Sequence, residues 1–169
     1  NGGFADRNEI FNKLSINNGF GLQCNGNTEL TIKCMSSKFP KVAVLGNSFS
    51  MQFVDSLSSH YKDGVVQLTL DSCKVGYLDS YEDINAMSCK DFYYASVKTI
   101  NENDAIELVF ISSPFDEVLD KNFRKSLIKL LNDLSRKSII ILGPTPSSTS
   151  NVGECFAEKY LNPFKNNLK

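Results

Sequence analysis

One run of the sequence, residues 41–57, constrains the fold more than any other. It begins with the unbroken apolar block 42–45, which is typical of a parallel strand buried on both faces. Apolar side chains then recur at the spacing of four that one face of a helix requires, at Phe49, Phe53 and Leu57. The run therefore predicts a strand over 41–46 that turns directly into a helix over about 49–61.

The turn between this strand and helix consists of Gly46, Asn47 and Ser48. Ligands of open α/β sheets bind where strands end, and a helix N-terminus favours an anion or oxyanion. Ser48 is therefore a candidate nucleophile, on a turn shaped by Gly46 and Asn47. The alternative is that Asn47 or Ser48 only caps the helix, as residues in such turns often do.

The rest of the chain repeats the alternation of strand and helix. Further strands are predicted over 65–70, 105–111 and 138–142, and helices over about 89–101, 117–135 and 153–161. This order predicts an α/β fold with a parallel sheet of four to five strands, right-handed crossovers and helices on both faces. We expect residues 1–40 to form a linker and N-terminal extension, and 41–169 to form the α/β domain.

Five cysteines indicate the compartment. Two local disulfides, Cys24–Cys34 and Cys73–Cys89, would each staple a polar segment, and their spacing is not that of a zinc site. Such bonds persist in an oxidising compartment, whereas reduced thiols in a cytosolic protein are the alternative. Cys155 would then lack a mate, which indicates a missing partner or a free thiol.

Charge and length exclude several classes of function. The 169 residues carry a net charge of −1 without a basic tract, so we expect no nucleic-acid partner. No apolar run approaches the length that a membrane span needs. The chain starts without a methionine and resembles an excised domain. We expect no cofactor and no metal.

A serine nucleophile needs a base, and the only histidine of the chain is His60. It follows Ser48 by twelve residues along the same predicted helix, or about 18 Å at ~1.5 Å per residue. His60 therefore cannot serve Ser48 within one molecule. Either the base lies beyond Lys169, in a C-terminal part that this chain lacks, or the domain is catalytically empty.

Several segments together resemble one known family. Residues 42–49 resemble the first block of SGNH (GDSL-type) hydrolases, an apolar strand followed by Gly-Asp-Ser-His or a close variant. Residues 2–7, the Asp71-Ser72-Cys73 run with Cys89, and the strand with its Gly-Pro-x-Pro exit at 139–146 resemble a narrower group. This group is the periplasmic SGNH domain of bacterial acyltransferase-three membrane proteins, such as the O-antigen O-acetyltransferases.

The resemblance implies a flavodoxin-like three-layer sandwich and a set of site residues. Ser48 takes the place of the nucleophile, and its backbone N–H that of one oxyanion donor. The other two donors would lie near Gly76 and near Ser112, although the Asn of the family is absent there. Asn47 replaces the usual Asp, and Phe49 stands where the membrane-linked group often has His.

The function implied is acetyl transfer to a sugar hydroxyl of a surface polysaccharide, such as lipopolysaccharide, through an acyl-serine. The Asp-x-x-His block that supplies the base is missing, so we expect the chain alone to be inactive and C-terminally truncated. The implied partners are a carbohydrate acceptor, an acyl donor and a membrane acyltransferase domain that tethers the domain to the periplasmic side of the inner membrane. The alternative is a degenerate SGNH-like module that binds glycan or a partner protein without catalysis.

Overall fold

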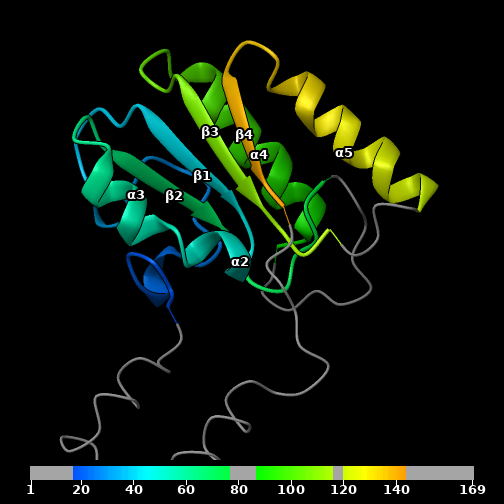
Figure 1. Ribbon diagram of the computed structural model, residues 1–169, viewed down its shortest axis with the longest axis horizontal. Helices are drawn as coiled ribbons and strands as arrows, with labels where there is room; N and C mark the ends of the chain where they lie inside the picture. Colours follow the sequence, from blue (N-terminus) through cyan, green and yellow to red (C-terminus); the bar gives the residue numbers. More distant parts are fainter. Residues whose placement is uncertain (1–16, 77–86, 116–119, 144–169) are drawn as a thin grey trace, which may run out of the picture. The chain divides into compact units, whose positions relative to one another are not determined.

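The computed structural model describes residues 17–76, 87–115 and 120–143. They contain one parallel sheet in the order β2-β1-β3-β4 (Figure 1). The strands are β1 (Val42–Gly46), β2 (Val65–Thr69), β3 (Leu108–Ser112) and β4 (Ser138–Leu142). The helices are α2 (Ser48–Met51), α3 (Val54–His60), α4 (Cys89–Glu102) and α5 (Lys121–Asp133). The predicted α/β fold is confirmed, while the helix predicted over 153–161 and Cys155 lie outside the described residues.

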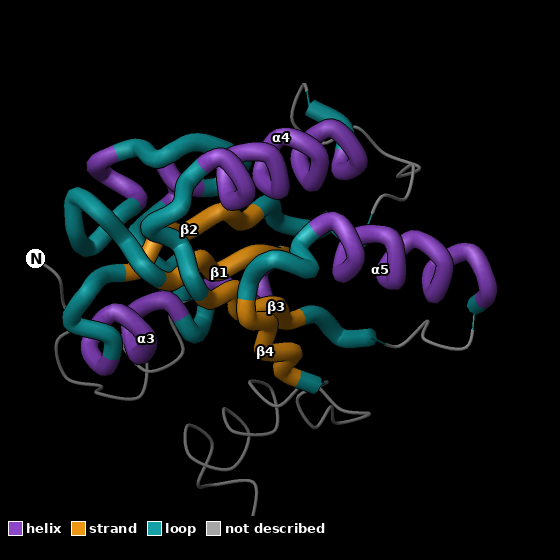
Figure 2. The backbone as a smooth tube through the Cα atoms, turned by 90° about the horizontal axis from the view of Figure 1, so that it is seen from above, coloured by secondary structure: helices purple, strands orange, loops and turns teal. Residues whose placement is uncertain are grey.

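Helices pack on both faces of the sheet (Figure 2), and successive residues of β1, which are all buried, contribute to the cores of opposite faces. On one face, α4 and α5 bury their apolar sides against odd-numbered positions of β1 and β3, such as Ala43 and Ile111. On the other face, Val54 of α3 packs with Val44 and Phe110. Both helices of the first face begin at a side-chain cap, because Ser88 and Asp120 accept the N–H groups of Asp91 and Phe123.

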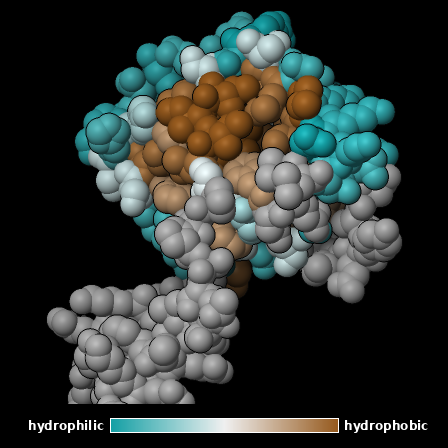
Figure 3. Space-filling view, turned by 45° about the vertical axis from the view of Figure 1, so that its right-hand side comes forward, coloured by the Kyte–Doolittle hydropathy of each residue, from teal (hydrophilic) through white to brown (hydrophobic). Residues whose placement is uncertain are grey.

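The second face is only partly covered by described residues. Phe110 of β3 is aligned with Ile140 of β4, which is 38 % exposed, and Ser112 with Leu142. Figure 3, in which the right-hand side of Figure 1 comes forward, shows an apolar area on this side of the molecule. Within the described ranges, therefore, this face is covered as far as Phe110 of β3, and Ile140 of β4 lies exposed beside it.

The free edge of β2 is covered by the segment 17–40, which contains the short 3₁₀ helices η2 (Leu22–Cys24) and η3 (Ile32–Cys34). The segment bridges to β2 at Asn25–Thr69 and again at Met35–Val66. The Gly26 N–H donates to the Thr69 carbonyl at 2.7 Å. An uncovered edge strand would offer unpaired backbone groups to other chains, so this segment protects the sheet.

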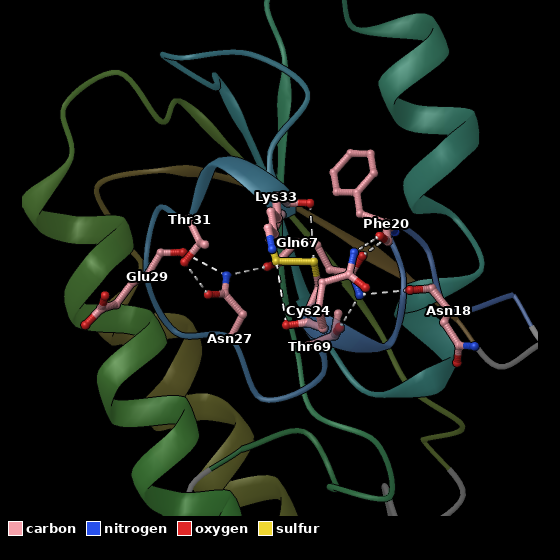
Figure 4. Close-up of a disulfide and its surroundings, with 11 residues drawn as sticks. Asn18, Phe20, Cys24, Asn27, Glu29, Thr31, Lys33, Gln67 and Thr69 are labelled. Atoms are coloured by element: carbon pink, nitrogen blue, oxygen red, sulfur yellow. Dashed lines mark hydrogen bonds between the residues drawn. A yellow bond between two sulfur atoms is a disulfide. The ribbon is translucent and has the colours of Figure 1, made fainter.

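Gln67 anchors the same segment from inside the domain. Its side chain is fully buried on β2, accepts the Phe20 N–H at 2.8 Å, and donates to the Asn18 carbonyl at 3.2 Å. A third bond runs to the Thr69 hydroxyl at 2.9 Å, so the amide is satisfied on both ends. Figure 4 shows these contacts beside the disulfide Cys24–Cys34. The second disulfide, Cys73–Cys89, joins the loop after β2 to the first residue of α4.

Three predicted elements differ from the structure. The helix predicted over about 117–135 is shorter, because Asp120 caps α5 and the helix runs only over Lys121–Asp133. The helix predicted over about 49–61 is divided into α2 and α3 by a turn at Gln52 and Phe53. There the Phe53 N–H donates to the Ser50 carbonyl, only three residues earlier in the chain. The side-chain amide of Asn17 donates to the Gln52 carbonyl at 3.3 Å. The apolar spacing continues across the turn, so periodicity alone gives no sign of the break.

The strand predicted over 105–111 begins later, at Leu108, and ends at Ser112. Asn103 causes the delay, because its side chain accepts the Ala105 N–H and its carbonyl accepts the Ile106 N–H. These bonds hold residues 103–106 in a turn. Backbone bonding to the β1 side starts where the N–H groups of Glu107 and Leu108 donate to the Lys41 carbonyl, at 2.9 and 3.1 Å.

Candidate functional site

The four strands end in register, so that their carboxyl ends lie side by side at one end of the sheet. Gly46 is aligned with Thr69 on one side and with Ser112 on the other, and Ser112 with Leu142. The strand order reverses at β1. From β1 the chain passes to β2 on one side of it, and later to β3 and β4 on the other side, so the switch point lies between β1 and β3. In open α/β sheets such a switch point forms the ligand-binding crevice. The end of β1 and the end of β3 are therefore the candidate site.

Gly46 makes the tight exit from β1 possible. Its φ is 149°, and a Cβ atom at this position would collide with the Ser50 side chain and lie 2.7 Å from the Ser112 carbonyl oxygen. Both the conformation and the close approach favour glycine. The turn is thus held directly against the end of β3.

Asn47 caps α2 and leaves Ser48 available. The Asn47 side-chain oxygen accepts the Phe49 N–H at 3.0 Å, and its carbonyl accepts the N–H groups of Ser50 and Met51. The Ser48 N–H remains without a partner among the described residues. Asn47 itself is buried, whereas the Ser48 side chain is exposed. The capping function and the exposed hydroxyl thus belong to two adjacent residues.

The structure brings Ser112 to the turn but not Gly76. Ser112 is buried beside Gly46, and its hydroxyl has no hydrogen-bond partner within the described part of the chain. Gly76 packs on α5, where its Cα side faces the Ser126 hydroxyl. No contact among the described residues joins Gly76 to Ser48, so the role of Gly76 as an oxyanion donor stays a prediction.

His60 lies near the amino ends of the strands, whereas Ser48 lies at their carboxyl ends. It is the last residue of α3, is exposed, and stacks edge-on against Tyr61 at 5.1 Å between ring centroids. The Tyr61 carbonyl accepts the Gly64 N–H, and the Gly64 carbonyl accepts the Val42 N–H where β1 begins. The imidazole is therefore a full strand length away from the candidate site.

Among the described residues, Tyr93 and Lys129 have perturbed ionisation, and both lie on helices away from the turn. Burial raises the pKa of the Tyr93 hydroxyl, which sits inside the α4 face of the core without a hydrogen-bond partner among the described residues. The hydrogen bond to Asp133 raises the pKa of Lys129 on the surface of α5. The described residues hold no cluster of three His, Cys, Asp or Glu side chains that could bind a metal ion.

Sequence patterns did not single out Ser50 or Gln67. Ser50 joins the turn to β3 through its buried hydroxyl, and Gln67 joins β2 to the N-terminal segment. The available signal for Gln67 was a polar residue inside an otherwise apolar strand, because such a residue needs buried partners. Ser50 gave a weaker signal, as one of several serines that follow the first strand.

These features define a class of protein: an α/β sandwich with an exposed serine on the turn after its first strand, at the switch point of the sheet. The family model of the SGNH domain fused to AT3 domains matches residues 23–168. The chain belongs to this family and is an acyltransferase-associated SGNH module. Searches of curated proteins and of solved structures gave no significant match.

The family match and the disulfides indicate which domain accompanies this module and which compartment it occupies. Fusion to AT3 domains associates the module with a membrane acyltransferase domain. Both disulfides fit an oxidising, extracytoplasmic environment. Among the helices that the structure describes, none has the length and apolar character needed to cross a bilayer.

Proposed function

We propose that this module takes part in acyl transfer to a carbohydrate hydroxyl, with Ser48 as the acyl acceptor. The observation that carries the proposal is the exposed Ser48 hydroxyl on the turn after β1, in a chain that matches the family over residues 23–168. The substrate class follows from the family resemblance, and O-acetylation of a surface polysaccharide such as lipopolysaccharide in the periplasm is its most specific form.

In the first step, the Ser48 oxygen attacks the carbonyl carbon of an acyl donor and its proton passes to a base. The tetrahedral intermediate places negative charge on the former carbonyl oxygen, which the Ser48 N–H, unpaired among the described residues, can stabilise. The donor group then leaves with a proton. In the second step, a sugar hydroxyl attacks the acyl-serine, gives its proton to the base, and releases the Ser48 hydroxyl.

If the base is a histidine, it must come from outside this sequence, because His60 lies at the opposite end of the strands from Ser48. That position also supports a second candidate function. A module without a base could bind glycan or a partner protein, and leave the chemistry to the fused acyltransferase domain. The two functions differ in whether the Ser48 hydroxyl is needed.

Replacing Ser48 by Ala in the complete parent protein separates these functions. We expect acetyl transfer to the polysaccharide to fall by at least about a thousandfold, because removal of a nucleophile eliminates the covalent route. When turnover of the wild-type protein is quenched, mass spectrometry should show one added acetyl group on Ser48. The matched control is Ser56→Ala, which removes an exposed hydroxyl from α3 and should leave transfer unchanged. Full activity of Ser48→Ala would favour the non-catalytic module.

A further inference from the structure

Ser50, the third residue of α2, connects three parts of the candidate site through one hydroxyl. Its oxygen lies 3.0 Å from the Leu45 carbonyl oxygen and 2.8 Å from the Ser112 carbonyl oxygen. The same oxygen accepts the Ser112 N–H at 3.0 Å. Ser50 thus joins the end of β1, the end of β3 and the beginning of α2, across 62 residues of sequence.

The hydroxyl lies where the ladder between β1 and β3 ends. Gly46 is the last residue of β1 and is aligned with Ser112, the last residue of β3. The Ser50 oxygen accepts the Ser112 N–H at this end, and its single proton is shared between the carbonyls of Leu45 and Ser112. Ser50 is 1 % exposed, so water cannot easily replace these bonds.

These contacts lie on both sides of the residue proposed as the nucleophile. In the chain, Ser48 lies between Gly46 and Ser50. The Gly46 backbone lies close to the Ser50 side chain and to the Ser112 carbonyl, and the Ser50 hydroxyl donates to the same carbonyl. The Asn47 carbonyl closes the same turn by accepting the Ser50 N–H at 2.8 Å. Any shift of Ser50 away from β3 therefore moves the backbone that carries Ser48 relative to Ser112.

We propose that Ser50 is the positioning residue of this site: its buried hydroxyl fixes the turn that carries Ser48 against the end of β3. The proposal rests on the proposed function of Ser48. It predicts that loss of the hydroxyl misplaces the attacking oxygen without removing any group that touches substrate. A displacement of about 1 Å is enough to lower a rate by up to a hundredfold.

The kinetic test uses the complete parent protein and 4-nitrophenyl acetate as the acyl donor. Ser50→Ala should lower kcat by at least about tenfold and change KM by less than about twofold, since ground-state contacts remain. Ser50→Thr keeps the hydroxyl and should recover most of kcat. The control is Val97→Ala, a buried truncation on α4 at the opposite face of the sheet, which should lower the melting temperature while kcat is kept.

A second readout follows the bridge itself, in the 169-residue chain. The Ser112 amide should exchange slowly with solvent in the wild type and markedly faster in Ser50→Ala, whereas the Ile111 amide, within β3, should keep its protection. Unchanged Ser112 exchange would overturn the bridge. A kcat for Ser50→Ala equal to that of Val97→Ala would overturn the positioning role while the function of Ser48 stands.

The two proposals fail in different ways. If Ser48→Ala keeps full activity, the function proposed for Ser48 is wrong, and the positioning role of Ser50 falls with it. If Ser48→Ala is inactive and Ser50→Ala is fully active, only the role of Ser50 is wrong. A tenfold loss in Ser50→Ala, recovery in Ser50→Thr and faster Ser112 exchange together support the proposal.

Discussion

At the scale of single residues, the turn after β1 separates two roles that its sequence left combined. Asn47 or Ser48 could each have been the helix cap. The structure assigns the cap to Asn47, whose side-chain oxygen accepts the Phe49 N–H, and leaves the Ser48 hydroxyl exposed. An aspartate carboxylate would accept the same bond, so the change to Asn preserves the shape of the turn and removes one charge.

Asn47→Ala tests this role of the side chain. Loss of the cap leaves the Phe49 N–H unsatisfied at a largely buried position, and we expect the free energy of unfolding to fall by about 1–2 kcal/mol. Asn47→Asp keeps the acceptor and should lose much less. Urea unfolding measures both, and Asp120→Ala, which removes the cap of α5, calibrates the scale. Equal stability of Asn47→Ala and the wild type would refute the capping role.

At the scale of elements, α4 carries two hydroxyl groups into the core. The hydroxyls of Tyr93 and Ser96 are fully buried and unpaired among the described residues. Both side chains share the face of α4 that packs on the sheet, together with Val97 and Ile100. A buried hydroxyl without a hydrogen bond costs free energy, so the Tyr93 hydroxyl should reduce the stability of the fold.

This unpaired hydroxyl predicts a pH dependence. Burial raises the pKa of Tyr93 above the ordinary value of about 10, so the folded protein keeps the proton that the unfolded chain loses. The stability contributed by neutral Tyr93 is complete below pH 10 and declines as the pH rises above it. Tyr93→Phe should therefore weaken the loss of stability above pH 10, and raise stability at pH 7 by up to about 1 kcal/mol.

Denaturant unfolding from pH 7 to pH 11 measures both effects. The matched control is Tyr94→Phe, because Tyr94 is the next residue of α4 and is 43 % exposed. It should leave the alkaline decline of the wild type unchanged. A decline in Tyr93→Phe as steep as in the wild type would show that other groups cause it.

At the scale of the whole described unit, the segment 17–40 completes the sheet. It covers the free edge of β2 through backbone bridges and through the buried amide of Gln67. The Cys24–Cys34 disulfide holds its two 3₁₀ helices together (Figure 4). The family model likewise begins within this segment, at residue 23. The edge strand therefore depends on residues that precede the first predicted strand.

Removal of residues 1–40 tests this dependence. A chain that starts at Lys41 exposes the backbone edge of β2 and leaves the Gln67 amide without its partners at Asn18 and Phe20. We expect it to aggregate and to lose cooperative unfolding, because exposed edges pair with other chains. Size-exclusion chromatography and thermal unfolding of both chains provide the comparison. A monomer with the melting temperature of the intact chain would show that residues 41–169 fold without the segment.

The four strands, the helices α4 and α5, the turn with Ser48 and the pair Cys24–Cys34 could be predicted from the amino-acid sequence. These features depend on periodicity and on residues close together in the chain, so a pattern can reveal them. Only the tertiary structure decided the strand order, the cover over β2 and the bond from Ser50 to Ser112. Each of these joins residues far apart in sequence, and is fixed by which backbone groups remain to be paired once the sheet has formed.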